Sequence, residues 1–206
     1  MMFARDIDLL RIEPMLFDLV RFHANVVLAR QSLIVDEDGV VSIAGHQGLG
    51  DQGFVLQSDN GLYEIAQEVS PAKYQLHRDP ALTDGATLPI LIADDFVAVK
   101  VATFRPQIAV VHTQLMRSVG LTSDIDESKV LNQTELVALE SYAALHLIFA
   151  AASGVGEKAD GFERRAAIHL ERFQDERERV GFLVDTDGSG TGNAVRRVSN
   201  LQLGRA

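Results

Sequence analysis

The chain has 206 residues, with 47% hydrophobic and 23% charged content. This composition fits a folded protein of one to two domains and excludes disordered, collagen-like and low-complexity classes. With 19 basic and 29 acidic residues, the net charge of −10 has the wrong sign for a protein that grips phosphates through a basic face. The lack of cysteine excludes disulfide scaffolds, thiolate zinc sites and cysteine nucleophiles.

The N-terminal region has a helical pattern. From Ile7 to Phe22, apolar residues recur at the spacing of one or two short helices, and Pro14 stands near the start of the second. The first residues carry acids where a signal peptide needs an uninterrupted apolar run. We therefore expect a mature, soluble chain.

Residues 26–103 have the pattern of short strands. The β-rich runs are 26–35, 40–45, 53–58, 62–69, 73–78, 88–93 and 96–104. The segments 36–39 and 59–61 are hairpin signals, because Gly, Asn and Asp tolerate the positive φ of tight turns. Close spacing of the runs predicts a small antiparallel sandwich or barrel.

Helical spacing returns after the strands. A helix is predicted from residue 104 until Gly120, and another from a capping box at Asn132 and Glu135 to about Ser153. A third helix is predicted to begin near Phe162. The chain then ends in extended segments, separated by the loop 185–193. These segments suggest a docking arm.

The order of these patterns indicates an α+β protein. The simplest arrangement is a helical bundle formed by the N- and C-terminal segments, with a small antiparallel β module inserted between them. The expected domains are 1–25 with 104–206, the helical core and its C-terminal arm, and 26–103, the β-rich module.

The segment from Leu136 to Ala152 is the most apolar part of the chain. Glu140, Ser141 and His146 interrupt it, so we expect it to fall short of a membrane span. Since it is apolar almost all round, it should be buried between helices or against a neighbouring subunit. The residues assigned to an inter-subunit face are Leu136, Leu139, Ala143, Leu147 and Ala150.

The loop after residue 184 resembles half of a calcium-binding loop. Asp185, Asp187 and Ser189 occupy alternate positions, and Gly190 occupies the sixth. The twelfth position is Arg196 where a bidentate Glu is needed, so these three residues are weak metal candidates. A tight loop between strands explains the same residues.

No arrangement of residues typical of catalysis is present in the sequence. The six histidines are scattered, without the helical spacing that would place two metal ligands on one face. His146 is interpreted as a satisfied core residue, with a pH-sensitive interhelical hydrogen bond as the alternative. We expect neither an enzyme nor a cofactor.

Five stretches together resemble virion proteins from the head–tail joining regions of tailed bacteriophages, in particular the head–tail connector (adaptor) proteins. They are IDLLRIEPMLF (7–17), TFRPQIAVVHTQLMRSVGL (103–121), LNQTELVALESYAALHLIFAAAS (131–153), FERRAAIHLERFQDE (162–176) and LVDTDGSGTGNAVRR (183–197). The long β segment departs from the mostly helical core of adaptors. It leaves open another neck component, a stopper or a tail terminator.

The resemblance implies a structural virion protein at the phage neck, made in the cytoplasm of the bacterial host. It would form a homo-oligomeric ring, a dodecamer by family analogy, that joins the portal protein to a tail or stopper protein. DNA would pass through without sequence-specific binding, helped by the negative charge, and no membrane would be involved. The portal-docking arm would include Arg196, Arg197, Leu201, Leu203 and Arg205.

A function of another class is also compatible with the sequence. The β segment could recognise a ligand or glycan, with calcium held by the Asp185 loop, as in a small calcium-dependent binding module.

Overall fold

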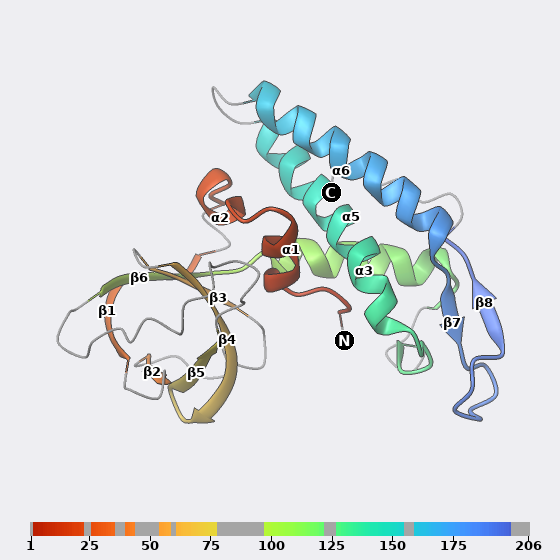
Figure 1. Cartoon of the computed structure of the whole chain (residues 1–206), viewed down its shortest axis with the longest axis horizontal. Coiled ribbons are helices and arrows are strands. Elements are labelled where there is room, and N and C mark those ends of the chain that lie inside the picture. Colours follow the sequence, from red (N-terminus) through yellow and green to blue (C-terminus); the bar gives the residue numbers. More distant parts are fainter. Residues whose placement is uncertain are drawn as a thin grey trace. The chain divides into compact units, whose positions relative to one another are not determined.

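The computed structural model describes residues 2–22, 26–35, 40–43, 54–58, 61–77, 97–121, 127–154 and 159–198. Within these residues lie helices and antiparallel sheets, so the expected mixture of the two is confirmed (Figure 1). The chain divides into two compact units. The first combines Met1–Leu9 with Arg105–Ala206, and the second is Leu10–Phe104.

The second unit contains a closed barrel of short strands. Its strands are β1 (Val26–Val35), β2 (Val40–Ser42), β3 (Val55–Ser58), β4 (Gly61–Ser70), β5 (Lys73–His77) and β6 (Val97–Ala102). They follow the order β1-β2-β5-β4-β3-β6, and every neighbouring pair is antiparallel. Six expected β-rich runs correspond to these strands. The remaining run, 88–93, lies outside the described residues.

Pairing of β1 with β6 closes the barrel. Register shifts interrupt this pair, and also the pair of β4 with β5, as expected where strands bend strongly to close a small barrel. Buried apolar side chains form one continuous cluster in this unit: Val41, Ile43, Phe54, Leu56, Tyr63, Ile65, Tyr74, Leu76 and Val101. Burial of this cluster is the main source of stability for the barrel.

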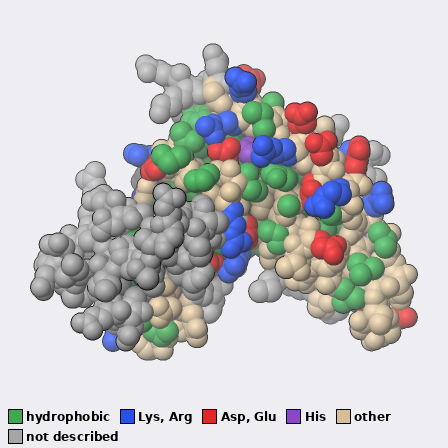
Figure 2. Space-filling model, viewed as in Figure 1, with side chains coloured by type: hydrophobic (Ala, Val, Ile, Leu, Met, Phe, Trp, Pro, Cys, Tyr) green, Lys and Arg blue, Asp and Glu red, His purple; other side chains and the backbone are tan. Residues whose placement is uncertain are grey.

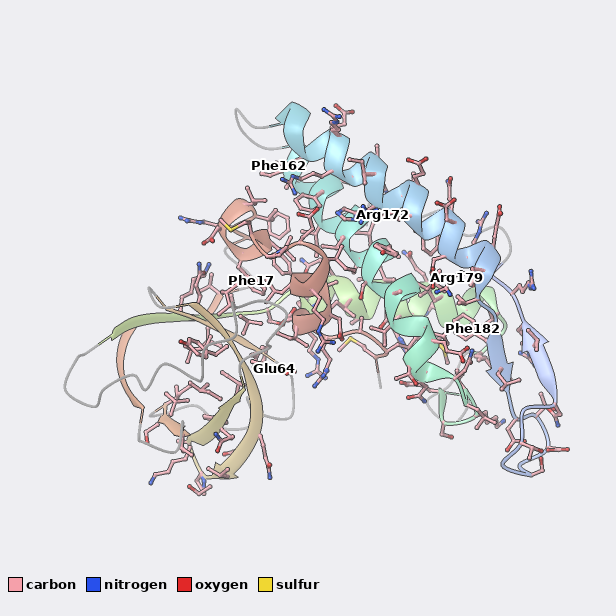
Figure 3. The ribbon with its side chains drawn as sticks, viewed as in Figure 1. Phe17, Glu64, Phe162, Arg172, Arg179 and Phe182 are labelled. Carbon is pink, nitrogen blue, oxygen red and sulfur yellow. The ribbon has the colours of Figure 1, made fainter. Side chains whose placement is uncertain are left out.

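Two short helices precede the barrel, α1 (Asp6–Ile12) and α2 (Leu16–Leu19), as the spacing predicted. Helix α2 packs within the second unit. The ring of Phe17, labelled in Figure 3, lies 4.8 Å from that of Phe104, and Asp18 Oδ1 accepts a hydrogen bond from Gln57 Nε2 on β3 at 2.5 Å. These contacts connect α2 to the residues at the end of β6 and on β3.

The first unit is built from three longer helices and a hairpin. They are α3 (Arg105–Ser118), α5 (Gln133–Ser153), α6 (Ala159–Arg179), β7 (Phe182–Val184) and β8 (Ala194–Arg196). Helix α3 packs against α5, and α5 packs along α6. Phe182 pairs with Arg196 in the antiparallel hairpin.

Helix α3 ends where the sequence predicts. Gly120 has φ +74°, a conformation that glycine adopts without strain, and the Leu121 amide bonds back to the carbonyl of Met116. Arg196 Nη1 donates to the Val119 carbonyl at 2.9 Å. The cation therefore binds the carbonyl end of α3, where the helix dipole favours it.

The start of α5 differs from the prediction. Asn132 is the N-cap residue, but its side chain makes no capping hydrogen bond. Its amide group instead donates to Glu135 Oε2, and its Oδ1 accepts from the backbone of Leu183 on β7. The predicted capping box is therefore wrong, because the side chain of Asn132 is used for a tertiary contact.

Helix α5 has the predicted length, but the expectation that its apolar segment falls short of a membrane span does not hold. It has 21 residues, and by length and composition alone it could cross a membrane, contrary to the expectation from sequence. In its most apolar window, however, 56% lies buried inside the protein. The core helix of a soluble protein meets the same criterion.

Candidate functional site: a buried histidine between two glutamates

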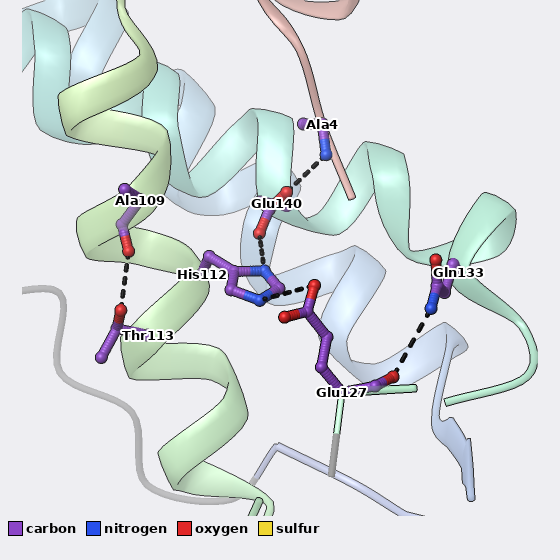
Figure 4. Close-up of polar contacts among 7 residues, drawn as sticks. All are labelled: Ala4, Ala109, His112, Thr113, Glu127, Gln133 and Glu140. Atoms are coloured by element: carbon purple, nitrogen blue, oxygen red, sulfur yellow. Dashed lines mark hydrogen bonds and ion pairs between the residues drawn. The ribbon is translucent and has the colours of Figure 1, made fainter. Parts of the chain in front are cut away.

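A polar cluster lies inside the helical unit, where α3 and α5 pack together (Figure 4). His112 is on α3, beside the buried face formed by Ile108, Val111 and Leu115. Glu140 is near the middle of α5, and its side chain is completely buried. Both residues are brought together by the apolar packing of their helices.

The imidazole of His112 lies between two carboxylates. Its Nδ1 is 2.7 Å from Glu140 Oε1, and its Nε2 is 3.5 Å from Glu127 Oε1. The side chains of His112 and Glu127 are only 12% and 11% exposed. The contact with Glu140 is a hydrogen bond, whereas the contact with Glu127 is longer and is not one.

The N-terminal segment completes the cluster. The backbone N–H of Ala4 donates to Glu140 Oε2, across 136 positions of sequence. Next to it, the ring of Phe3 meets the His112 ring edge-on at 4.8 Å and the Phe182 ring at 5.8 Å. Phe3 and Ala4 are 7% and 0% exposed. Residues 2–5, which we call the N-terminal strap, are thus held by α3, α5 and β7.

The partners of Glu140 offset the free-energy cost of burying its carboxylate. A buried carboxylate is stable only when paired and hydrogen-bonded, and removal of one partner from such a pair typically costs about 3–5 kcal/mol. Glu140 receives both forms of compensation, from His112 and from Ala4. Because both oxygens of Glu140 are hydrogen-bonded from within the helical unit, the arrangement indicates a structural junction.

Sequence reasoning did not identify this cluster. In the sequence, His112 is one of six scattered histidines, and Glu140 only interrupts an apolar segment. That interruption was the available signal, because a carboxylate in the most apolar helix of a chain needs a partner.

Other histidines connect α5 with α6. The Nδ1 atom of His146 lies 2.9 Å from the carbonyl of Ala166, so the interhelical hydrogen bond considered for it is present. His169 is stacked between Phe149 at 5.6 Å and Tyr142 at 6.3 Å. These contacts stabilise the packing of the two helices.

Guanidinium groups lie beside this aromatic stack. Arg172 on α6 (Figure 3) is 5.8 Å from the Tyr142 ring, and Arg165 is 5.7 Å from the Phe149 ring. Cation–π contacts of this kind stabilise a partly exposed helix pair. Elsewhere on the visible surface of this unit, acidic and basic side chains are mixed (Figure 2).

The carboxylates of the candidate metal loop accept hydrogen bonds from the loop's own backbone amides. Asp185 accepts hydrogen bonds from the amides of Gly188, Ser189 and Gly190 at 2.7–3.1 Å, and Asp187 accepts from the Ser189 amide at 3.1 Å. Hydrogen bonds from the Ser189 hydroxyl and amide, in that order, lower the pKa of Asp187 to about 2. The described residues contain no group of three or more His, Asp or Glu side chains that could hold a metal ion.

Two residues of the predicted docking arm bond to the helical unit itself. Arg196 donates to the end of α3, and Arg197 Nη1 is 3.4 Å from the carbonyl of Glu178 at the end of α6. Leu201, Leu203 and Arg205 lie outside the described residues. A role for this arm in docking stays a prediction.

The residues assigned to the inter-subunit face separate into two groups. Leu136, Leu139 and Ala143 are fully buried within the chain, so their side chains pack inside it. Leu147 and Ala150 are half-buried. Only these two have surface left for a neighbouring subunit in this conformation, and that role stays a prediction.

Comparison with known proteins gave no match: no family model, curated protein or solved structure resembles the chain closely enough to assign it. The function is therefore argued from the residues and the geometry described above.

Proposed function

We propose that this protein is a non-enzymatic structural component of the neck of a tailed bacteriophage. In this proposal it forms a ring, acts as a head–tail adaptor between the portal and the tail, and encloses the DNA channel. It needs no cofactor for this role, because the mechanism is assembly.

The observation that carries the proposal is the position in the fold of the stretches that resemble head–tail adaptor proteins. Four of these stretches fold into α3, α5, α6 and the β7–β8 hairpin: they are 103–121, 131–153, 162–176 and 183–197. Apart from residues 103 and 104, all four belong to the first compact unit. The described strands between α2 and α3 form the barrel of the second unit. This supports the finer proposal of a helical core, made by both ends of the chain, that carries an inserted β module.

Helix α5 supplies a surface for assembly. Leu147 and Ala151 continue along the side of α5 that carries Glu140 and Ala144, since these positions follow one another at helical spacing. Glu140 and Ala144 are buried, Leu147 is half-buried and Ala151 is exposed. A ring protomer needs apolar surface of this kind that a neighbour covers.

The charge of the chain suits a channel for DNA. A net charge of −10 repels the phosphate backbone, so DNA could slide past without sticking.

Native mass spectrometry and negative-stain microscopy of the protein, alone and mixed with a phage portal ring, test the proposal. Closed rings, or a complex of fixed stoichiometry on the portal, are expected. Leu147→Glu should abolish the rings, whereas Ile168→Glu, at a 39% exposed position on α6, is the matched control and should leave them intact. A monomer that ignores the portal would contradict the proposal.

A further inference from the structure

We propose that the open edge of the β7–β8 hairpin pairs with the same edge of a second copy of the chain, in an antiparallel register centred on Val195. This contact uses β8 instead of the α5 surface assigned to the ring, so the inference does not depend on the proposed neck function.

The hairpin has one open edge. Strand β7 pairs with β8 on one side, and on its other side Val184 forms an antiparallel bridge with Val130. Strand β8 is therefore the last strand of this sheet among the described residues, and Figure 1 shows it on the side of β7 that faces away from the helices. An edge strand presents backbone N–H and C=O groups with which another strand can pair.

The register of the hairpin decides which backbone groups of β8 point outward. The N–H and C=O of Leu183 bond to Asn132 and Leu131, on the side of β7 opposite β8. Leu183 is paired with Val195, so the two residues of this pair exchange no backbone hydrogen bond. The N–H and C=O of Val195 accordingly point away from β7. One residue thus presents both a donor and an acceptor at the open edge.

Apolar side chains cross the outer face of this sheet in one row. Leu131 and Val195 flank Leu183 on the neighbouring strands, and they are 42% and 66% exposed. A Cβ atom at Gly181 would lie 2.8 Å from Val195 Cγ1, so the Val195 side chain lies on the face that Gly181 shares with Leu183. Phe182, on the opposite face, is fully buried. The exposed row ends at the open edge, where a second copy would continue it.

A second copy matches both features of the edge. When two β8 strands lie antiparallel about a two-fold axis at Val195, each Val195 N–H meets the Val195 C=O of the other copy. Both outward backbone groups are then satisfied by a single residue type. The two apolar rows also join into one, because the Val195 side chains of the two copies become cross-strand neighbours.

The charges near the edge permit this pairing. In the two-fold register Arg196 faces Ala194 of the second copy and Arg197 faces Asn193, so no two like charges face each other directly. Both guanidinium groups are also bonded within their own chain, to carbonyl groups at the ends of α3 and α6. Lysine and proline, which commonly block an edge strand, are absent from residues 193–197.

Sedimentation equilibrium of the full chain measures the association. Because β8 has three residues and the contact is small, we expect a monomer–dimer equilibrium with a dissociation constant between about 1 µM and about 1 mM. The measurement is made in the unmodified chain and in Leu147→Glu, which removes the proposed ring contact. Loss of rings and loss of dimers are therefore separate readouts. A monomer throughout this concentration range in Leu147→Glu would overturn the inference.

Charge exchange at residue 195 tests the register. Val195→Lys and Val195→Glu each place two like charges face to face and remove the apolar contact, so each variant alone should associate about tenfold more weakly. An equimolar mixture should recover the association, because each lysine then faces a glutamate. Val110→Lys, at a 37% exposed position on α3, is the matched control and should associate normally. A mixture without recovery would contradict pairing through residue 195.

The outward donor can be removed without loss of a bond to β7. In Val195→Pro the missing N–H is one that points to the open edge, so the variant should fold and lose the association. Val195→Thr keeps the donor and the branched shape, and it should keep the association. Dimers of Val195→Pro as stable as those of the unmodified chain would refute the proposed backbone pairing.

Amide hydrogen exchange of Val195, followed by NMR, gives a second readout. At a protein concentration ten times the dissociation constant, the monomer fraction and the exchange rate of this amide should be about fivefold lower than in the dilute protein. The Leu183 amide, which is bonded to Asn132, should exchange at the same rate at both concentrations. An exchange rate of Val195 that does not depend on concentration while dimers form would place the contact elsewhere and overturn the inference.

Discussion

Asn132 binds the backbone of Leu183, which lies 51 residues further along the chain. Its Oδ1 accepts from the Leu183 amide at 2.9 Å, and its Nδ2 donates to the Gly181 carbonyl at 2.8 Å. One side chain therefore joins the start of α5 to the start of the β7–β8 hairpin.

Replacing this residue should loosen the hairpin. In Asn132→Ala, the amide of Leu183 and the carbonyl of Gly181 each lose a part-buried partner, so we expect the free energy of unfolding to fall by about 1–3 kcal/mol. Urea denaturation measures this change. Thr134→Ala, at an exposed position in the first turn of α5, is the control and should have a much smaller effect. Equal losses in the two variants would contradict the role given to Asn132.

Gly192 allows the close approach of Leu183 within the hairpin. A Cβ atom at residue 192 would lie 2.3 Å from Leu183 Cγ, so Gly192→Ala should destabilise the protein by about 1–3 kcal/mol through overpacking. Leu183→Ala in the same chain should relieve part of this loss. Thermal unfolding of the single and double variants measures it, and strictly additive losses would exclude the clash as the cause.

Gly161, near the start of α6, gives the opposite expectation. A Cβ atom there meets nothing within 4 Å, so Gly161→Ala should stabilise the protein by about 0.5–1 kcal/mol through improved helix propensity. Urea denaturation checks the sign. A destabilised variant would contradict the helix at this position.

The pKa of Asp187 is lowered to about 2 from its ordinary value of 3.8, first of all by the Ser189 hydroxyl. Because the folded state favours the ionised carboxyl, its contribution to stability is present above about pH 4 and is lost as pH falls toward 2. Ser189→Ala should raise the pKa of Asp187 toward 3.8. NMR titration of the carboxyl carbon measures it, and an unchanged pKa would show that the hydroxyl is not the cause.

On the barrel, burial lowers the pKa of Lys100, and the charge of Arg21 lowers it further, whereas Asp18 raises it. Arg21→Gln should therefore raise the pKa of Lys100, and Asp18→Asn should lower it. NMR titration of the lysine side chain in both variants measures these shifts. Because the two substitutions should act in opposite directions, shifts of the same sign would contradict this assignment of causes.

Much of the secondary structure could be predicted from the sequence. The β-rich runs of the second unit and the helix from Gln133 to Ser153 follow from residue patterns that repeat over two or about four positions. The turn at Gly120 follows from the conformational freedom of glycine. These features depend on neighbours within a few residues, and so they are visible in the sequence alone.

The partners of the polar side chains could not be predicted in the same way. Asn132 was expected to cap its own helix, but a strand 51 residues away competes for the same oxygen. Asp185 and Asp187 have the residue types of cation ligands, but the amides of their own loop bind them. Local pattern shows which group needs a partner, whereas packing decides which group supplies it.

The sequence by itself therefore determined the order of the described helices and strands, the turn at Gly120, and the excess of acidic charge. Tertiary structure alone decided that the strands close into a barrel and that Glu140, His112 and Ala4 meet in the interior of the helical unit. The physical reason is separation: Ala4 and Glu140 are 136 positions apart, so only the packing of α3, α5 and the N-terminal strap brings them within hydrogen-bonding distance.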